Sequence, residues 1–142
     1  MILGVMAEPT EIALGMMEIV NSSASADEAM AGLEARFHPE IEYVNPEDAI
    51  EGGTRRGLDG MRLVFENYYA GVGGASTTDI EEVEGRGDRA LVVGRPHLRG
   101  ESSGVEVRGP QVGLVFTVRD GMILRIEWHF DIDEARARLE DA

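Results

Sequence analysis

A change in the spacing of apolar residues at Thr77 constrains the fold of this chain more than any other feature. Before it, apolar residues recur at helical spacing. After it they alternate, and turn-forming pairs at residues 87–88, 99–100 and 120–121 divide the segment into about four strands. Strands joined by such short turns run antiparallel. The sequence therefore predicts helices followed by an antiparallel sheet, which is the α+β class.

The first half of the chain contains three predicted helices. The first covers residues 10–21. The second begins at Ser25 or Asp27, either of which can cap it, and ends at Pro39. The third has Asp59 at its N-cap and ends at the glycines that follow residue 70. The apolar positions of the second helix are Ala29, Met30, Leu33 and Phe37, and those of the third are Met61, Phe65, Tyr68, Tyr69 and Val72.

A short strand and a short final helix complete the predicted order of elements. The strand covers residues 41–46 and leads into a charged, glycine-rich loop at residues 47–57. The last helix covers residues 134–139. Because the helices are separate from the sheet along the chain, we expect them to cover one of its faces. The length fits a single domain spanning residues 1–142.

The charge and composition exclude several classes of function. Thirteen Lys and Arg residues against 27 Asp and Glu give a net charge of −14, which repels phosphate backbones and anionic membranes. We therefore expect neither nucleic acid nor a membrane as a partner. The first residues lack a basic leader, so we expect a cytoplasmic protein. The chain has no cysteine for thiolate catalysis or zinc–thiolate sites, and we expect no cofactor and no metal.

Two strands near the end of the chain carry matching apolar rows. Side chains two apart on a strand share a face. One row belongs to the last strand and the other to the strand before it, and both are expected to face the helices as a dry wall. The last strand contributes Leu124, Ile126, Trp128 and Phe130, and its neighbour contributes Val112, Leu114, Phe116 and Val118. The opposite face of the last strand carries Ile123, Arg125, Glu127 and His129.

The strand at residues 90–99 carries the strongest candidates for chemistry. Its bulky row begins with Leu91 and Val93 and continues with Arg95 and His97. A buried charge is costly without a partner, so Arg95 on an apolar face implies a carboxylate partner, a ligand or an open end of the sheet. Arg95 could bind a carboxylate or enolate oxygen while His97 transfers a proton. In the alternative, the strand leaves the core after Val93 and both side chains lie in solvent.

Tyr43 and Asn45 form a second candidate pair. They lie two apart on the predicted strand, so a phenol and an amide share one face. The pair could line a cavity, or it could be a buried pair that satisfies its own hydrogen bonds. Asp131 precedes Glu134 by three residues, as in a capping box, and we expect it to cap the last helix rather than to act in catalysis.

Several segments together resemble the SnoaL-like branch of the NTF2-like superfamily. They are HPEIEYVNP at residues 38–46, RRGLDGMRLVFENYY at 55–69, SGVEV at 103–107 and VRDGMILRIEWHFDIDEA at 118–135. The resemblance implies an NTF2-like cone, in which a strongly bent antiparallel sheet wraps around a long helix and leaves an internal pocket. It also implies a homodimer formed through the outer face of the sheet. Because this superfamily includes cyclases, isomerases, hydrolases and binding domains, the resemblance is more specific for fold than for activity.

The resemblance also disfavours some of the known chemistries. Ketosteroid isomerases carry a base aspartate where this chain has Asn45, and an oxyanion-donor aspartate where it has Leu114. Limonene-type epoxide hydrolases match at Tyr43, Asn45 and Arg95, but one of their two aspartates falls on His97 and the other on a tryptophan. The aspartate base of SnoaL-type cyclases has no clear counterpart on the expected pocket face.

Three functions fit these residues. The first is a cofactor-independent isomerase, cyclase or hydrolase that acts on an apolar or polycyclic carbonyl compound, with Arg95, His97, Tyr43 and Asn45 as its catalytic groups. The second is a non-catalytic pocket that binds such a compound. The third is a protein-interaction module that uses the outer face of the sheet. The residues expected to line the ligand pocket are Trp128, Ile126, Leu114, Phe116, Phe65 and Tyr69.

Overall fold

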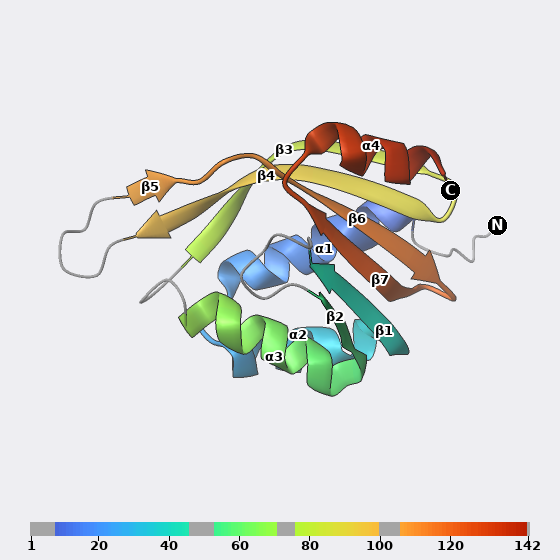
Figure 1. Ribbon diagram of the computed structural model, residues 1–142. Coiled ribbons are helices and arrows are strands. Elements are labelled where there is room, and N and C mark those ends of the chain that lie inside the picture. The colour runs from blue at the N-terminus through green and yellow to red at the C-terminus, as the bar shows by residue number, and fades with distance from the viewer. Residues whose placement is uncertain (1–7, 46–52, 71–75, 100–105, 142) are drawn as a thin grey trace.

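The computed structural model describes residues 8–45, 53–70, 76–99 and 106–141 of the chain. Within these ranges, four α-helices and one short 3-10 helix pack on a single curved sheet of seven strands (Figure 1). The helices α1, α2 and α3 lie on the inner face of the sheet, and α4 lies on its outer face (Figure 1). Among the described residues, no helix is long and apolar enough to span a membrane. The predicted α+β class is confirmed.

The helices begin where local sequence signals place them. Pro9 occupies the first turn of α1, where a backbone N–H would lack a partner within the helix in any case. Ser25 caps α2 by accepting a hydrogen bond from the Glu28 N–H at 3.2 Å. Asp131 caps α4 by accepting hydrogen bonds from two backbone N–H groups, including that of Glu134. The helices are α1 (Pro9–Ser22), α2 (Ala26–Leu33), η1 (Glu34–Arg36), α3 (Gly57–Ala70) and α4 (Ile132–Glu140).

The strands follow the order β2-β1-β7-β6-β4-β3, and β5 extends the sheet beside β4. Neighbouring strands pair antiparallel except β1 and β7, which run parallel. Neither this parallel pair nor β2 is predicted from the sequence, because residues 53–56 have the composition of a loop. The strands are β1 (Phe37–Asn45), β2 (Gly53–Arg56), β3 (Ser76–Arg86), β4 (Arg89–Arg99), β5 (Glu106–Arg108), β6 (Val112–Arg119) and β7 (Met122–His129).

The end of the second helix and the start of the third differ from the prediction. The second helix stops short of Pro39, because η1 leads directly into β1 at Phe37. Phe37 is only 1% exposed and stacks on Phe65 with 6.2 Å between ring centroids, so it reaches the core from a strand. Asp59 lies in the first turn of α3 and not at its cap, since the helix already begins at Gly57. The predicted helix position Val72 lies outside the described residues.

The main hydrophobic core lies between the inner face of the sheet and α1, α2 and α3. It includes Phe116 of β6 and Ile126 of β7, as the alternation of these strands predicts. A register shift between Thr117 and Val118 interrupts the pairing of β6 with β7. Because of this irregularity, Ile123 also joins the main core and is fully buried, although simple alternation assigns it to the opposite face.

The outer face of the sheet is covered in part by α4, contrary to the expectation that all helices lie on one face. Leu91 and Val93 of β4 and Val115 of β6 pack there in a second buried cluster, together with Ala135 and Leu139 of α4. The strand β4 is therefore apolar on both faces, because Ala90 and Val92 belong to the main core. This arrangement decides which side chains of β4 can reach the interior.

Candidate functional site

A cavity of about 460 Å³ lies between the inner face of the sheet and the helices α1 and α3. This volume falls within the range typical of small-molecule sites. Most of the cavity wall is apolar, and its polar side chains come mainly from β1, β2 and α3. The apolar side chains include Met16, Met17, Val20, Val64, Phe65, Val112, Leu114, Phe116, Ile126 and Trp128. The polar side chains are Tyr43, Asn45, Arg55, Asn67, Tyr68 and Thr78.

Five of the six residues expected to line a pocket lie in this wall, namely Trp128, Ile126, Leu114, Phe116 and Phe65. The sixth, Tyr69, points elsewhere. Its hydroxyl donates a hydrogen bond to the Val20 carbonyl at 2.9 Å, and burial raises its pKa to about 12. Tyr68 lines the cavity in its place and meets the Tyr69 ring edge-on, with 5.0 Å between centroids.

Tyr43 and Asn45 both line the cavity from β1, so the structure brings this predicted pair together. Asn45 Nδ2 donates a hydrogen bond to the Gly53 carbonyl at 3.3 Å, which ties the end of β1 to β2. Burial raises the pKa of Tyr43 far above its ordinary value, and the neighbouring Tyr68 adds to the effect. Tyr43 therefore stays protonated at neutral pH, and it can donate a hydrogen bond but cannot act as a base.

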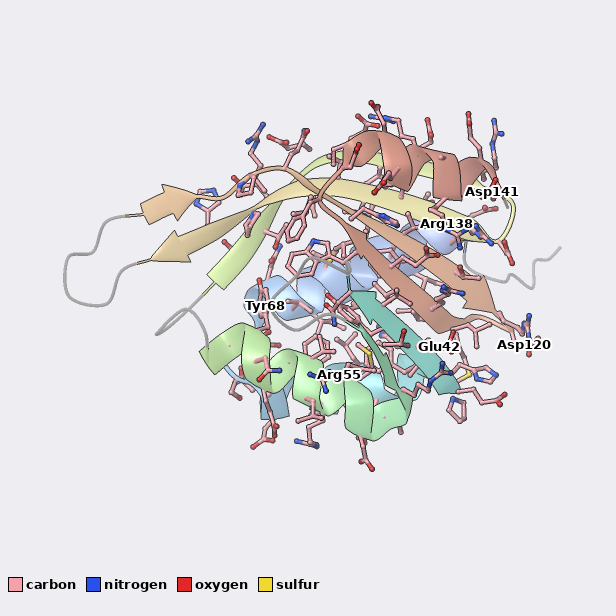
Figure 2. All side chains as sticks on the ribbon, in the orientation of Figure 1. Glu42, Arg55, Tyr68, Asp120, Arg138 and Asp141 are labelled. Carbon is pink, nitrogen blue, oxygen red and sulfur yellow. The ribbon has the colours of Figure 1, made fainter. Side chains whose placement is uncertain are left out.

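Arg55 is a site residue that the sequence does not reveal. It lies on β2 directly opposite Tyr43 and lines the cavity, whereas its neighbour Arg56 forms an ion pair with Glu42. Figure 2 shows Arg55 beside α3, and Tyr68 on the side of α3 that faces the sheet. The sequence signal for Arg55 is the pair Arg55-Arg56. Adjacent residues of a strand point to opposite faces, so one of the two arginines must face inward. That signal carries weight only once residues 53–56 are known to form a strand.

Gly60 allows α3 to pack closely on Arg55. A Cβ atom on Gly60 would lie 3.1 Å from the Arg55 carbonyl carbon and 3.2 Å from the Arg55 Cβ. Both distances are shorter than ordinary van der Waals contacts. The first turn of α3 therefore rests directly on the backbone of β2 and limits where Arg55 can move.

Arg95 and His97 do not project into the cavity, contrary to the expectation for the bulky row of β4. Arg95 Nε lies 3.2 Å from Glu81 Oε2, and His97 Nε2 lies 2.5 Å from Asp79 Oδ2. The physical reason is that Leu91 and Val93, which share their face, are covered by α4 on the outer side of the sheet. Position 96 of β4 faces inward instead, and its proline lines the cavity.

The cavity lies in a chain whose sequence matches a known domain family. Residues 19–126 match the family of the SnoaL-like domain, which is well over half of the chain. This chain belongs to the SnoaL-like domain family. A search of curated proteins gives no significant match.

Solved structures show the same fold as this SnoaL-like domain. The crystal structure of TerC with polyporic acid is 26% identical and has a TM-score of 0.66, with 93% of this chain and 97% of TerC covered. An NTF2-like protein from Burkholderia pseudomallei is 20% identical, with coverage of 96% and 100% and a TM-score of 0.68. An LEH-like epoxide hydrolase from M. tuberculosis is 16% identical, with coverage of 94% and 90% and a TM-score of 0.64. The predicted SnoaL-like membership and NTF2-like fold are confirmed.

The SnoaL-like domain also contains a buried charged cluster, which lies outside the cavity wall. Glu127 of β7 is 4% exposed and accepts a hydrogen bond from Arg138 Nε of α4 at 2.8 Å. Burial alone would raise the pKa of Glu127, but Arg138, helped by Arg125 and His129, holds it below the ordinary value. His129 thus lies on the outer face, with Nε2 3.6 Å from Glu127 Oε1. This cluster attaches α4 to the sheet.

The functional groups of the wall residues determine which reactions the cavity could support. Among the wall residues that the structure describes, none is a carboxylate or an imidazole. The same residues offer neutral hydrogen-bond donors at Tyr43, Asn45 and Thr78, and a guanidinium at Arg55. The described part of the chain also brings together no group of three His, Cys, Asp or Glu side chains that could hold a metal ion. The described wall of this cavity thus combines apolar side chains with hydrogen-bond donors and one guanidinium.

Proposed function

We propose that this protein binds a small apolar or polycyclic compound that carries a carbonyl or another oxygen group. The observation that supports this is the cavity of about 460 Å³, whose wall is apolar except for a few polar side chains, mainly on β1, β2 and α3. An apolar ring system would fill the hollow between Phe65 and Trp128, and its oxygen would accept hydrogen bonds from Tyr43 and Arg55. The relative TerC, which was crystallised with polyporic acid, supports a ligand of this kind.

Binding without turnover is the form of this proposal that the wall residues favour. Proton removal from carbon needs a base, and the described wall contains no carboxylate and no imidazole. The phenol of Tyr43 is neutral, and the side chain of Asn45 cannot accept a proton at neutral pH. The ligand would therefore be held and shielded from water but not transformed.

A cofactor-independent hydrolase is the second candidate, and one observation favours it. Tyr43 and Asn45 lie two residues apart on one face of β1, and both line the cavity. A phenol and an amide in this relation can hold a water molecule beside a bound epoxide or ketone. The similarity to an LEH-like epoxide hydrolase supports this alternative at the level of fold.

The single tryptophan of the chain provides a direct test, because Trp128 lines the cavity. We would titrate the protein with 9-fluorenone and with cyclohexene oxide, follow the Trp128 emission, and analyse the same mixtures for products by NMR. Saturable quenching without product supports binding, and formation of a diol supports the hydrolase. Absence of saturable quenching by every compound contradicts both candidates.

Two variants of α3 and β6 make this test specific. Leu114→Phe adds volume inside the cavity, and it should weaken the binding of 9-fluorenone roughly tenfold or more. Leu63→Phe makes the same change on α3 at a side chain that is 44% exposed and lies outside the wall, so it should leave binding unchanged. Equal effects of the two variants would place the ligand outside the cavity.

The proposal includes a homodimer formed through the outer face of the sheet. The helix α4 covers Leu91 and Val93 of β4 and Val115 of β6 on this face. The contact would therefore use β3 and the part of β4 beyond Val93, where Arg95 and His97 lie. A native mass spectrum at micromolar concentration would show twice the chain mass. A monomer would contradict this part of the proposal, and a complex with a different protein would favour an interaction module.

A further inference from the structure

We infer that the cavity selects compounds with an ionised acidic oxygen, such as a carboxylate, a phenolate or an enolate, and that Arg55 is the residue that recognises it. The inference rests on the proposed function, because it names the class of compound that the same cavity binds. It assigns the charge of the ligand, which the shape and apolar wall of the cavity leave open.

The described wall residues carry an unbalanced positive charge. Arg55 is the charged residue of the described wall, and no carboxylate in that wall balances its charge. A guanidinium remains protonated at any physiological pH. Arg55 is partly exposed, so in the free protein water solvates it. A ligand anion would replace that water with charge-assisted hydrogen bonds.

Arg55 differs from the arginines near it, which pair with carboxylates. Arg56, the next residue of β2, forms an ion pair with Glu42. Arg62, on α3, lies 2.8 Å from Asp27 Oδ1. No described carboxylate pairs with Arg55 in the same way. Arg56 and Arg62 are therefore neutralised by carboxylates of the protein, whereas Arg55, which faces the cavity, is left for a ligand.

The groups around Arg55 suit an anionic oxygen. Tyr43 lies directly opposite on β1 and presents a phenol that stays protonated, so it can donate to the same oxygen. The planar guanidinium can form two parallel hydrogen bonds with a carboxylate. The apolar wall reduces screening by water, which strengthens the attraction between guanidinium and anion. A neutral ketone would use only part of this arrangement.

The strand β2 holds Arg55 in place. The close approach of Gly60 to the Arg55 backbone fixes β2 against α3, and Asn45 Nδ2 binds the Gly53 carbonyl at the start of the strand. A recognition group on a supported backbone loses less freedom when its ligand binds. Arg55 is thus placed as a specificity residue.

The net charge of −14 acts in the opposite direction, since it repels anions from the protein as a whole. At physiological ionic strength this repulsion is screened over roughly 8 Å. The contact with Arg55 is much shorter and is less screened. We therefore expect the preference to appear at 150 mM salt, which is the condition for the test.

The test compares two probes of nearly equal shape, 2-naphthoate and 2-naphthamide, by calorimetry at pH 7. The wild-type protein, Arg55→Gln and Arg56→Gln are each titrated with both. Arg56→Gln is the matched control, because it removes the adjacent guanidinium outside the cavity wall. The quantity of interest is the ratio of the two dissociation constants, so a small change in folding cancels.

We expect Arg55→Gln to weaken the binding of 2-naphthoate roughly tenfold or more and that of 2-naphthamide less than about twofold. Arg56→Gln should change neither value by more than about twofold. If Arg55→Gln leaves the ratio as it is in the wild type, the inference is overturned while the proposed function stands. If neither probe binds to the wild type and 9-fluorenone also fails to bind, the proposed function itself is contradicted.

Discussion

Glu127 shows how a single residue can attach an element to this fold. It is the buried carboxylate of the described residues, and Arg138 contacts both of its oxygens, at 2.8 and 3.3 Å. Arg125 Nε adds a third cationic contact at 3.6 Å. A buried charge that is paired on several sides is stable in place, but removal of one partner leaves the others uncompensated.

Replacement of Glu127 by Gln should therefore lower the free energy of unfolding at pH 7 by roughly 1 to 3 kcal/mol. Urea denaturation followed by circular dichroism would measure the loss. Glu82→Gln is the comparison. Glu82 lies on β3 and forms a solvent-exposed ion pair with Arg136 of α4, so its replacement should cause a clearly smaller loss. Equal losses would mean that burial of Glu127 plays no special part.

The stabilising effect of the Glu127–Arg138 pair should be lost at low pH. The fold holds the pKa of Glu127 below its ordinary value, so its stabilising effect is complete above the unfolded-state pKa of about 4.3. The effect disappears as the pH falls through the lower folded-state pKa. Denaturation midpoints of the wild type and Glu127→Gln should therefore converge below pH 4. If the difference between the two midpoints stays constant down to pH 2, the ionised form of Glu127 is not the source of the stabilisation.

Tyr43 gives a second prediction at the residue scale. Because burial keeps the phenol protonated, the affinity of the wild type for 9-fluorenone should be constant between pH 6 and 9. Tyr43→Phe should weaken this binding by about tenfold or less, as expected for loss of one hydrogen bond. Trp128 emission titrations measure both. A sharp fall in affinity near pH 8 would show that a titrating group controls binding.

At the scale of elements, the contact between α4 and β6 depends on a missing side chain. A Cβ atom on Gly113 would lie 2.7 Å from the Ala135 Cβ, which is too close for two carbon atoms without a shift. Gly113 thus lets α4 rest on the sheet and cover Leu91 and Val115. The position of α4 in turn decides that this face of β4 is the outer one.

Gly113→Ala should move α4 away from the sheet and lower the free energy of unfolding by about 1 to 3 kcal/mol. Thermal denaturation and hydrogen exchange of residues 132–140 would measure this. The matched change is Gly15→Ala in α1, where the new Cβ would meet only the flexible end of Arg36 at 3.3 Å. It should be neutral or should stabilise by up to about 1 kcal/mol. Faster exchange in both variants would indicate a general loss of stability.

Most elements of this fold can be predicted from the sequence, because their signals are local. Alternation and turn pairs identify the long strands, and Ser25 and Asp131 mark helix starts by their hydrogen-bonding chemistry. The inward face of β4 cannot be predicted in this way. Its Ala90–Val92 row and its Leu91–Val93 row are both apolar, and only the position of α4 distinguishes them.

The same reasoning explains which site residues escape prediction. Tyr43 and Asn45 follow from a clear strand, whereas Arg55 lies in a strand of four residues that has the composition of a loop. The adjacent residues Tyr68 and Tyr69 both fit the apolar side of α3, and only the partner at the Val20 carbonyl shows that Tyr69 turns away from the cavity. Such assignments depend on contacts between distant segments.

At the scale of the whole molecule, the strong negative charge opposes the compact state. A net charge of −14 on 142 residues produces self-repulsion, which added salt screens. We expect the melting temperature at pH 7 to rise when NaCl increases from 10 to 150 mM, as measured by differential scanning calorimetry. A fall would mean that local ion pairs, such as that of Glu127 and Arg138, outweigh the overall repulsion.

The proposed function requires that the space between α3 and the bent sheet receives an apolar ligand. The most direct measurement is a crystal structure of the protein soaked with 9-fluorenone. We predict ligand density between Phe65 and Trp128, with the ketone oxygen within hydrogen-bonding distance of Tyr43 or Arg55. Density only on the outer surface, with the cavity holding nothing but water, would contradict the account.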